Sequence, residues 1–183
     1  MVDTEQQIAR NLERQFAEMG FATQGVEALR AGADVSLRTL YKYFPSREAM
    51  VIGALNYRDR TYAEWIGEGP DTGAAHVLHV LDRLSDWLHQ ISNKGCLFRN
   101  ALAAYPESDP IRSAVEEHKA HVREMFRRRL THVAPDCPVE DLTLALFLLH
   151  EGLTESARLI GPEAATAATQ RCAWALLAAE EIY

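Results

Sequence analysis

The chain has 183 residues, 48% of them hydrophobic and 25% charged, which is the composition of an ordinary globular protein of one or two compact units. This composition excludes collagen-like, disordered and disulfide-stapled classes, and three cysteines without metal-type spacing favour a reducing compartment. The net charge of −7 lies wholly in residues 61–183, because residues 1–60 carry eight basic and eight acidic side chains.

Hydrophobic residues recur at helical spacing along most of the chain, and no segment alternates for long enough to predict a strand. In the first element the spacing joins Ile8, Leu12 and Phe16, and Gly20 supplies a stop. All seven prolines lie where these hydrophobic patterns break, and none lies inside a pattern. The pattern predicts an all-α protein with nine helices, near residues 4–19, 24–31, 36–42, 46–66, 72–92, 95–104, 109–133, 138–160 and 162–182.

The predicted helices differ in length along the chain, since the first three are short and the later ones are long. The most linker-like stretch is 67–73, which is rich in glycine, proline and capping residues. A helix that crosses between two units is compatible with this pattern. We therefore expect a unit of three short helices at residues 1–48 and a helical bundle at residues 49–183.

Residues 23–44 are most simply interpreted as a helix, a tight turn and a second helix. Gly32 and Asp34 permit the unusual backbone angles of a turn, and Ser36 is suited to cap the second helix. The residues expected to face inward and set the angle between the two helices are Val26, Leu29, Val35, Leu40 and Phe44.

The opposite face of the second helix carries long cationic and hydroxylated side chains that suit base edges and phosphate oxygens. Residues 36–47 contain three cations and no acid, so a local positive patch occurs in a chain of negative overall charge. A helix of this size fits the major groove of DNA. The alternative is an ordinary solvated helix face with its tyrosines partly in the core. The outward residues are Arg38, Thr39, Tyr41, Lys42 and Tyr43.

The run TLYKYFPSREAM at 39–50, with 16–20 and 35–36, closely resembles the signature of the tetracycline-repressor-like (TetR) family of bacterial regulators. The resemblance covers roughly residues 5–55, and beyond residue 60 it extends only to length, helicity and helix count. Asp34 stands where the family usually has glycine, and Arg38 stands where it often has glycine. By this resemblance we expect residues 1–48 to be a helix-turn-helix DNA-binding domain and residues 49–183 to be an effector-binding and dimerisation domain. The resemblance implies DNA contacts from Thr23, Gln24, Ser36, Leu37, Arg38, Thr39, Tyr41, Lys42, Tyr43 and Arg47, with the first two near a phosphate and the last against the DNA backbone.

The last two predicted helices suggest a self-association surface. The helix at 138–160 has apolar side chains on nearly every face, and the alanine-rich helix at 162–182 permits close approach. The simplest interpretation is a four-helix interface between two copies over residues 138–182, and an intrachain core is the alternative. The resemblance also implies a small-molecule effector pocket enclosed by helices 72–92, 95–104, 109–133 and 138–160. Its candidate lining residues are Trp65, Trp87, Phe98, Asn100, Tyr105, His118, Phe147, His150 and Glu151.

These observations predict a cytoplasmic, homodimeric transcriptional repressor that a small-molecule effector releases from a palindromic operator in double-stranded DNA. The alternatives are a ligand-independent or activating DNA-binding dimer on the same fold, and a helical small-molecule-binding module without DNA binding. We expect no enzyme, because the chain has no glycine-rich phosphate loop, nucleophile elbow or defined carboxylate pair.

We expect no cofactor, no metal and no membrane partner. The histidines at 76 and 79 and at 118 and 121 share helix faces, but a third ligand of fixed spacing is missing. Cys96 follows Gly95 near a helix start, where a redox-sensitive thiol is an alternative to a plain buried cysteine. The longest apolar run, 144–149, is far shorter than the roughly 20 residues of a membrane span. The N-terminus has no features of a secretory signal.

Overall fold

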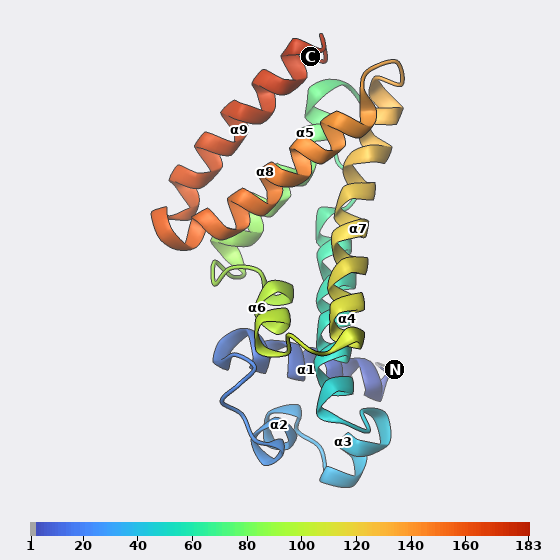
Figure 1. Cartoon of the computed structure of the whole chain (residues 1–183), viewed down its shortest axis with the longest axis vertical. Helices are drawn as coiled ribbons and strands as arrows, with labels where there is room; N and C mark the ends of the chain where they lie inside the picture. Colours follow the sequence, from blue (N-terminus) through green and yellow to red (C-terminus); the bar gives the residue numbers. More distant parts are fainter. Residues whose placement is uncertain (1–2) are drawn as a thin grey trace. The chain divides into compact units, whose positions relative to one another are not determined.

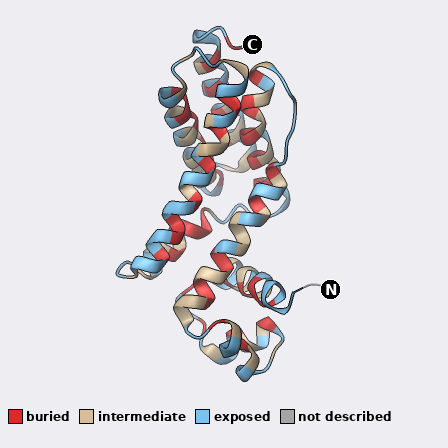
Figure 2. Cartoon of the chain, turned by 90° about the vertical axis from the view of Figure 1, so that its right-hand side faces the viewer, coloured by how far each residue is buried: buried red, intermediate tan, exposed pale blue. Residues whose placement is uncertain are grey.

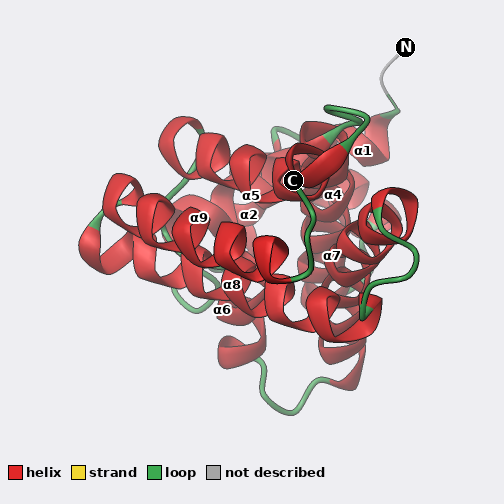
Figure 3. Ribbon diagram, turned by 90° about the horizontal axis from the view of Figure 1, so that it is seen from above, coloured by secondary structure: helices red, strands yellow, loops and turns green. Residues whose placement is uncertain are grey.

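The computed structural model describes residues 3–183, and in this range it contains nine α-helices and no strand (Figures 1 and 3). The all-α prediction is therefore confirmed, and most predicted boundaries lie within two residues of the observed ones. The helices are α1 (Thr4–Met19), α2 (Val26–Ala33), α3 (Leu37–Tyr43), α4 (Arg47–Ile66), α5 (Gly73–Gln90), α6 (Leu97–Ala104), α7 (Asp109–Val133), α8 (Val139–Ile160) and α9 (Pro162–Ala179).

The helices form two compact units, and each unit combines segments that are separate in the sequence. Unit 1 comprises the described residues up to Glu64 together with Cys96–His118, and unit 2 comprises Trp65–Gly95 together with Lys119–Tyr183. Helices α4 and α7 contribute to both units. The two domains expected from the sequence, residues 1–48 and 49–183, are defined by their functions and not by their contacts. That division stays a prediction.

The core of unit 1 joins the first three helices to α4, α6 and the beginning of α7. Leu12, Leu29, Leu40 and Met50 are completely buried in it, and Ile111 of α7 is completely buried in the same cluster. Burying one such side chain stabilises a fold by about 1.5–3 kcal/mol. The helix-turn-helix segment therefore shares one hydrophobic core with residues that follow it by more than fifty positions.

The turn between α2 and α3 is made by Asp34, which adopts a left-handed conformation with φ of 57°. Gly32 lies inside α2, so the expectation that it shapes the turn is wrong. Helix α2 also starts and ends two residues later than predicted, because Gly25 is its extended N-cap and Asp34 its C-cap. As predicted, Ser36 caps α3, and its Oγ accepts a hydrogen bond from the backbone N–H of Thr39 at 3.1 Å.

Gly53 gives the core of unit 1 room for an aromatic ring. It lies inside α4, where glycine costs about 1 kcal/mol relative to alanine. A Cβ added at Gly53 would lie 3.0 Å from Cδ1 and Cζ of Phe44, and closer still to Cε1. Phe44 is only 5% exposed, so its ring has little freedom to move away. The glycine thus allows Phe44, the C-cap residue of α3, to pack against α4.

In unit 2, α8 and α9 run side by side and pack with α5 (Figure 1). The buried side of α9 consists mostly of small residues, including Ala165 and Ala173, which lets the helices approach closely. The hydroxyls of Ser85 on α5 and Thr166 on α9 form a hydrogen bond of 2.9 Å. Figure 2 shows that the helices carry buried residues on one side and exposed residues on the other.

Candidate nucleic-acid interface

Helix α3 presents four exposed side chains on its solvent side. Leu37, Arg38, Tyr41 and Lys42 are all exposed, whereas Leu40 and Phe44 on the other side are buried. We call these four exposed residues the α3 outer face. Within the part of the chain that the structure describes, Arg38 forms no hydrogen bond or ion pair, and Lys42 Nζ lies 5.0 Å from the ring centroid of Tyr43. The α3 outer face therefore offers two cations and a phenol to a partner.

Two of the other predicted contact residues of α3 form its N-terminal cap. The Oγ of Ser36 accepts from the backbone N–H of Thr39, and the hydroxyls of Ser36 and Thr39 are hydrogen-bonded at 2.8 Å. Such a cap stabilises a helix by about 1 kcal/mol. Tyr43, at the C-terminal end of the helix, is partly buried against the core of unit 1. Ser36, Thr39 and Tyr43 therefore stabilise α3 and its packing, whereas the residues of the α3 outer face are exposed.

Thr23 and Gln24, which the family resemblance places near a phosphate, have partners at the end of α1. Thr23 Oγ1 donates to the carbonyl of Met19 at 3.0 Å. Gln24 is only 8% exposed, and its Nε2 donates to the carbonyls of Gly20 at 3.0 Å and Gln15 at 3.3 Å. Thr23 follows Met19 by four residues, and Gln24 follows Gly20 by four. This spacing is the signal in the sequence for side chains that bind carbonyls at the end of α1.

Arg47 is partly buried, and its three guanidinium nitrogens all donate to groups of unit 1. Its Nε donates to the hydroxyl of Tyr105 at 2.6 Å, and its Nη1 to the carbonyl of Gln24 at 2.5 Å. Its Nη2 donates to the carbonyl of Phe21. Tyr105 is 58 residues away in the sequence, so no local pattern predicts this partner. Arg47 joins the start of α4 to the loop between α1 and α2.

The neighbouring residue, Glu48, contacts the same region of unit 1. Ser108 Oγ donates to Glu48 Oε1, and it accepts from the backbone N–H of Ile111 at 3.2 Å. Ser108 thus caps the beginning of α7 while it holds a carboxylate in the first turn of α4. An acidic side chain in the first turn is itself favourable, because the helix dipole is positive there.

The nine candidate lining residues of an effector pocket are divided between the two units. Phe98, Asn100, Tyr105 and His118 belong to unit 1. There, Phe98 and His118 stack face to face with ring centroids 3.6 Å apart, and His118 Nδ1 lies 2.7 Å from Asp59 Oδ1. The assignment of these residues to a pocket lining stays a prediction.

The five lining candidates of unit 2 are Trp65, Trp87, Phe147, His150 and Glu151. Trp65 and Trp87 pack edge to face with centroids 5.7 Å apart, and Trp65 Nε1 donates to the carbonyl of Arg83 at 2.8 Å. The guanidinium carbon Cζ of Arg123 lies over the ring of Phe147, 5.7 Å from the ring centroid.

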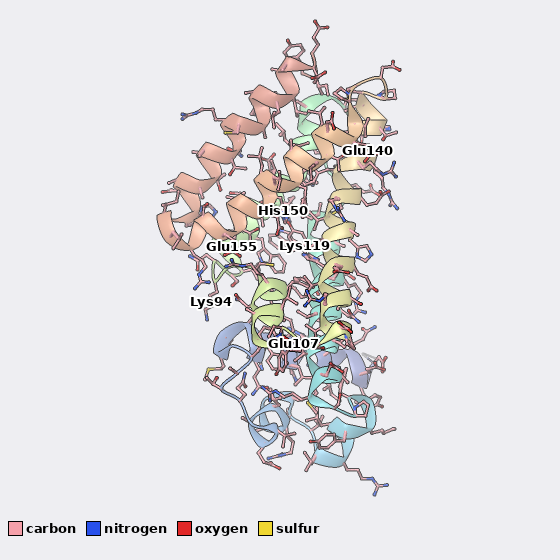
Figure 4. The ribbon with its side chains drawn as sticks, in the orientation of Figure 1. Lys94, Glu107, Lys119, Glu140, His150 and Glu155 are labelled. Atoms are coloured by element: carbon pink, nitrogen blue, oxygen red, sulfur yellow. The ribbon has the colours of Figure 1, made fainter. Side chains whose placement is uncertain are left out.

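A charged cluster surrounds His150 on α8, which Figure 4 labels together with Lys119 of α7. Lys119 Nζ donates to both carboxylate oxygens of Glu151 at 2.7 Å, and His150 Nδ1 lies 3.3 Å from Glu151 Oε1. Burial lowers the pKa of His150, because the charged imidazolium loses its hydration. Burial alone would raise the pKa of Glu151, but the hydrogen bond to His150 and the charge of Lys119 outweigh it and lower this pKa to about 2.

No group of three or more metal-ligating side chains occurs among the described residues. The three cysteines are free, and Cys96 is the buried one. No helix of the described chain has the length and apolar character needed to cross a membrane.

Comparisons with known proteins point to one family. Residues 10–54 match the family model described as bacterial regulatory proteins, tetR family. The HTH-type transcriptional regulator YjdC of Escherichia coli (strain K12) is 25% identical over 124 residues, which are 65% of this chain and 65% of that protein. The chain thus aligns with less than two thirds of the length of this relative.

Solved structures share the fold over nearly the whole chain. A TetR-family transcriptional regulator from Streptomyces coelicolor superposes with a TM-score of 0.83 and 23% identity, covering 95% of this chain and 94% of that one. A cysteine mutant of the TetR-family regulator CifR, solved with 26-base-pair double-strand operator DNA, superposes with a TM-score of 0.76 and 22% identity, covering 94% and 96%. The family and these relatives are transcriptional regulators rather than enzymes. The chain therefore carries, at residues 10–54, a segment that matches the tetR family of bacterial regulatory proteins, and over nearly its whole length it has the fold of solved TetR-family regulators.

Proposed function

We propose that the protein is a homodimeric transcriptional repressor that binds a palindromic operator through the α3 outer face. The observation that carries this proposal is the exposure of Arg38, Tyr41 and Lys42 on one side of a helix whose other side is buried. Arginine and lysine are the side chains that most often read guanine and neutralise phosphates. A relative with this fold was solved with operator DNA, which supports the same docking.

The division of roles within unit 1 follows from the partners of each side chain. We assign direct base and phosphate contacts to the α3 outer face, because its cations are exposed. The other residues implied by the family resemblance have protein partners, so we assign them the support of α3 and its flanking turns. These supporting residues are Thr23, Gln24, Ser36, Thr39, Tyr43 and Arg47.

The second copy is proposed to pack on the exposed apolar side of α8 and α9. Leu144, Leu148, Leu159 and Ile160 of α8 and Trp174 of α9 are exposed large apolar residues of unit 2. Covering such a surface with the same surface of another copy gives a closed two-fold dimer. A dimer also presents two α3 helices, which fits half-sites about one DNA turn apart.

We further propose that a small-molecule effector binds the later helices and releases the DNA. The polar cluster of Lys119, His150 and Glu151 supports this proposal, because the buried His150 contacts Glu151 on one side and packs edge to face with the ring of Phe126. An effector acts only through its different affinities for the two conformations. A thermal-shift screen in which no small molecule raises the melting temperature would favour a ligand-independent regulator instead.

The first experiment is selection of bound fragments from randomised duplex DNA, followed by affinity measurement against salt concentration. We expect a palindromic site and a steep salt dependence. Arg38→Ala should change which bases are selected, and Lys42→Ala should lower the salt slope by about 0.9 per protomer. Arg128→Ala is the matched control, since Arg128 is an exposed cation of α7 in unit 2. Failure of the folded wild-type chain to enrich any sequence would refute the proposal.

A further inference from the structure

The turn that joins α6 to α7 holds two consecutive residues at the start of α4. Tyr105 accepts the hydrogen bond from Arg47 Nε at 2.6 Å, and Ser108 Oγ donates to Glu48 Oε1. The turn is closed by a hydrogen bond from the backbone N–H of Ser108 to the carbonyl of Tyr105 at 3.2 Å. The hydroxyls of Tyr105 and Ser108, at the two ends of this 105–108 turn, therefore both hydrogen-bond side chains in the first turn of α4.

The guanidinium of Arg47 extends this connection to the segment that precedes α2. It donates to the carbonyls of Phe21 and Gln24, and both of these residues precede α2, which begins at Val26. The ring of Phe21 packs edge to face with that of Tyr105, with centroids 6.4 Å apart. Arg47 itself follows the end of α3 by four residues, so its side chain connects the chain just after α3 to the chain just before α2.

These contacts make a direct phosphate contact by Arg47 costly. All three of its nitrogens donate within unit 1. Rotation of the side chain toward DNA would break three charge-assisted hydrogen bonds and leave two backbone carbonyls without this donor. The arginine fork suits this arrangement because its nitrogens point in different directions, whereas lysine offers a single nitrogen.

We propose that Arg47 is a positioning residue for DNA recognition, which together with Tyr105 sets the orientation of α2 and α3 instead of binding phosphate. This inference rests on the proposed function of the α3 outer face. It assigns to the 105–108 turn the role of holding the reading helix in its DNA-binding orientation. A displacement of the turn by α6 or α7 would change the presentation of α3 without any change in its own residues.

The test is a double-mutant cycle with Arg47→Lys and Tyr105→Phe, measured as affinity of the full chain for its selected operator against salt. Arg47→Lys keeps the charge but loses the fork, and Tyr105→Phe keeps the ring against Phe21 but loses the hydroxyl. We expect each variant to bind roughly tenfold more weakly with an unchanged salt slope. The double variant should bind no more weakly than the weaker single variant, because both changes remove the same connection.

Two results would overturn the positioning role. One is wild-type affinity for Arg47→Lys, which would mean that the charge alone matters. The other is a salt slope that falls by about 0.9 per protomer in Arg47→Ala, which is the signature of a lost phosphate contact. Additive losses in the cycle would also contradict the connection between Arg47 and Tyr105.

A matched control separates positioning from general destabilisation. Arg58 is another partly buried arginine of α4, and its Nε donates to Glu13 Oε1 of α1 at 2.6 Å. We expect Arg58→Lys to lower the urea midpoint of unfolding while the folded protein keeps its operator affinity. Equal losses of affinity in the Arg58 and Arg47 variants would show a structural role only. A wild-type chain that enriches no DNA sequence would refute the proposed function itself, which is a different outcome from an additive cycle.

Discussion

Replacement of Gly53 by alanine is expected to destabilise the protein, although alanine is the better helix former. Inside α4, alanine should gain about 1 kcal/mol of helix propensity over glycine. The added methyl group, however, would lie 3.0 Å or less from three ring atoms of Phe44, which is buried in the core of unit 1. Overpacking of this kind costs about 1–3 kcal/mol. The net loss should therefore be on the order of 1 kcal/mol.

Urea denaturation followed by far-ultraviolet circular dichroism measures this loss as a lower midpoint at an unchanged m-value. Phe44→Leu supplies the matched background, because it removes the ring that the methyl group meets. In that background Gly53→Ala should become stabilising by about 1 kcal/mol, so the two substitutions should be strongly coupled. If Gly53→Ala stabilises the wild-type chain by the full propensity gain, the ring of Phe44 is free to move and the reasoning is wrong.

Three further predictions concern the turn, the charged cluster and the proposed interface. Asp34→Gly should raise the free energy of unfolding by about 0.5–1 kcal/mol in urea titrations, because glycine adopts the left-handed conformation with less strain. The stabilisation from Glu151 should be present above pH 4.5 and be lost as the pH falls toward its folded pKa of about 2. Glu151→Gln removes the ion pair with Lys119, so it should make the melting temperature less dependent on pH over that range. Leu148→Glu should give a monomer in light scattering, whereas Met19→Glu, at a comparably exposed apolar residue, should not; a Leu148→Glu dimer would contradict the interface.

Features that depend on neighbouring residues could be predicted from the sequence. The cap at Ser36 depends only on the backbone three residues later, and the inward positions Leu29 and Leu40 follow from helical spacing. The sequence predicts the turn less well, because both Gly32 and Asp34 tolerate the required backbone angles. In the structure Gly32 is helical and Asp34 makes the turn.

Features that depend on distant residues had no signal in the local pattern. The run that contains Arg47 resembles a DNA-contacting motif, but the hydroxyl of Tyr105 that accepts its hydrogen bond lies 58 residues later. For the same reason the sequence did not indicate that α6 shares a core with the helix-turn-helix segment. Helical periodicity shows which side of a helix is buried, and it does not show which other helix covers that side.

The shared core of unit 1 has a consequence for the design of chimeric regulators. An N-terminal fragment that ends with α4 lacks Phe98, Ala101 and Ile111, which are buried in the same cluster as Leu12 and Leu40. Exchange of that fragment alone between two regulators would place foreign side chains opposite the buried core residues that segment 96–118 contributes. The transferable module is therefore the N-terminal segment together with residues 96–118, grafted as two pieces of one packed body.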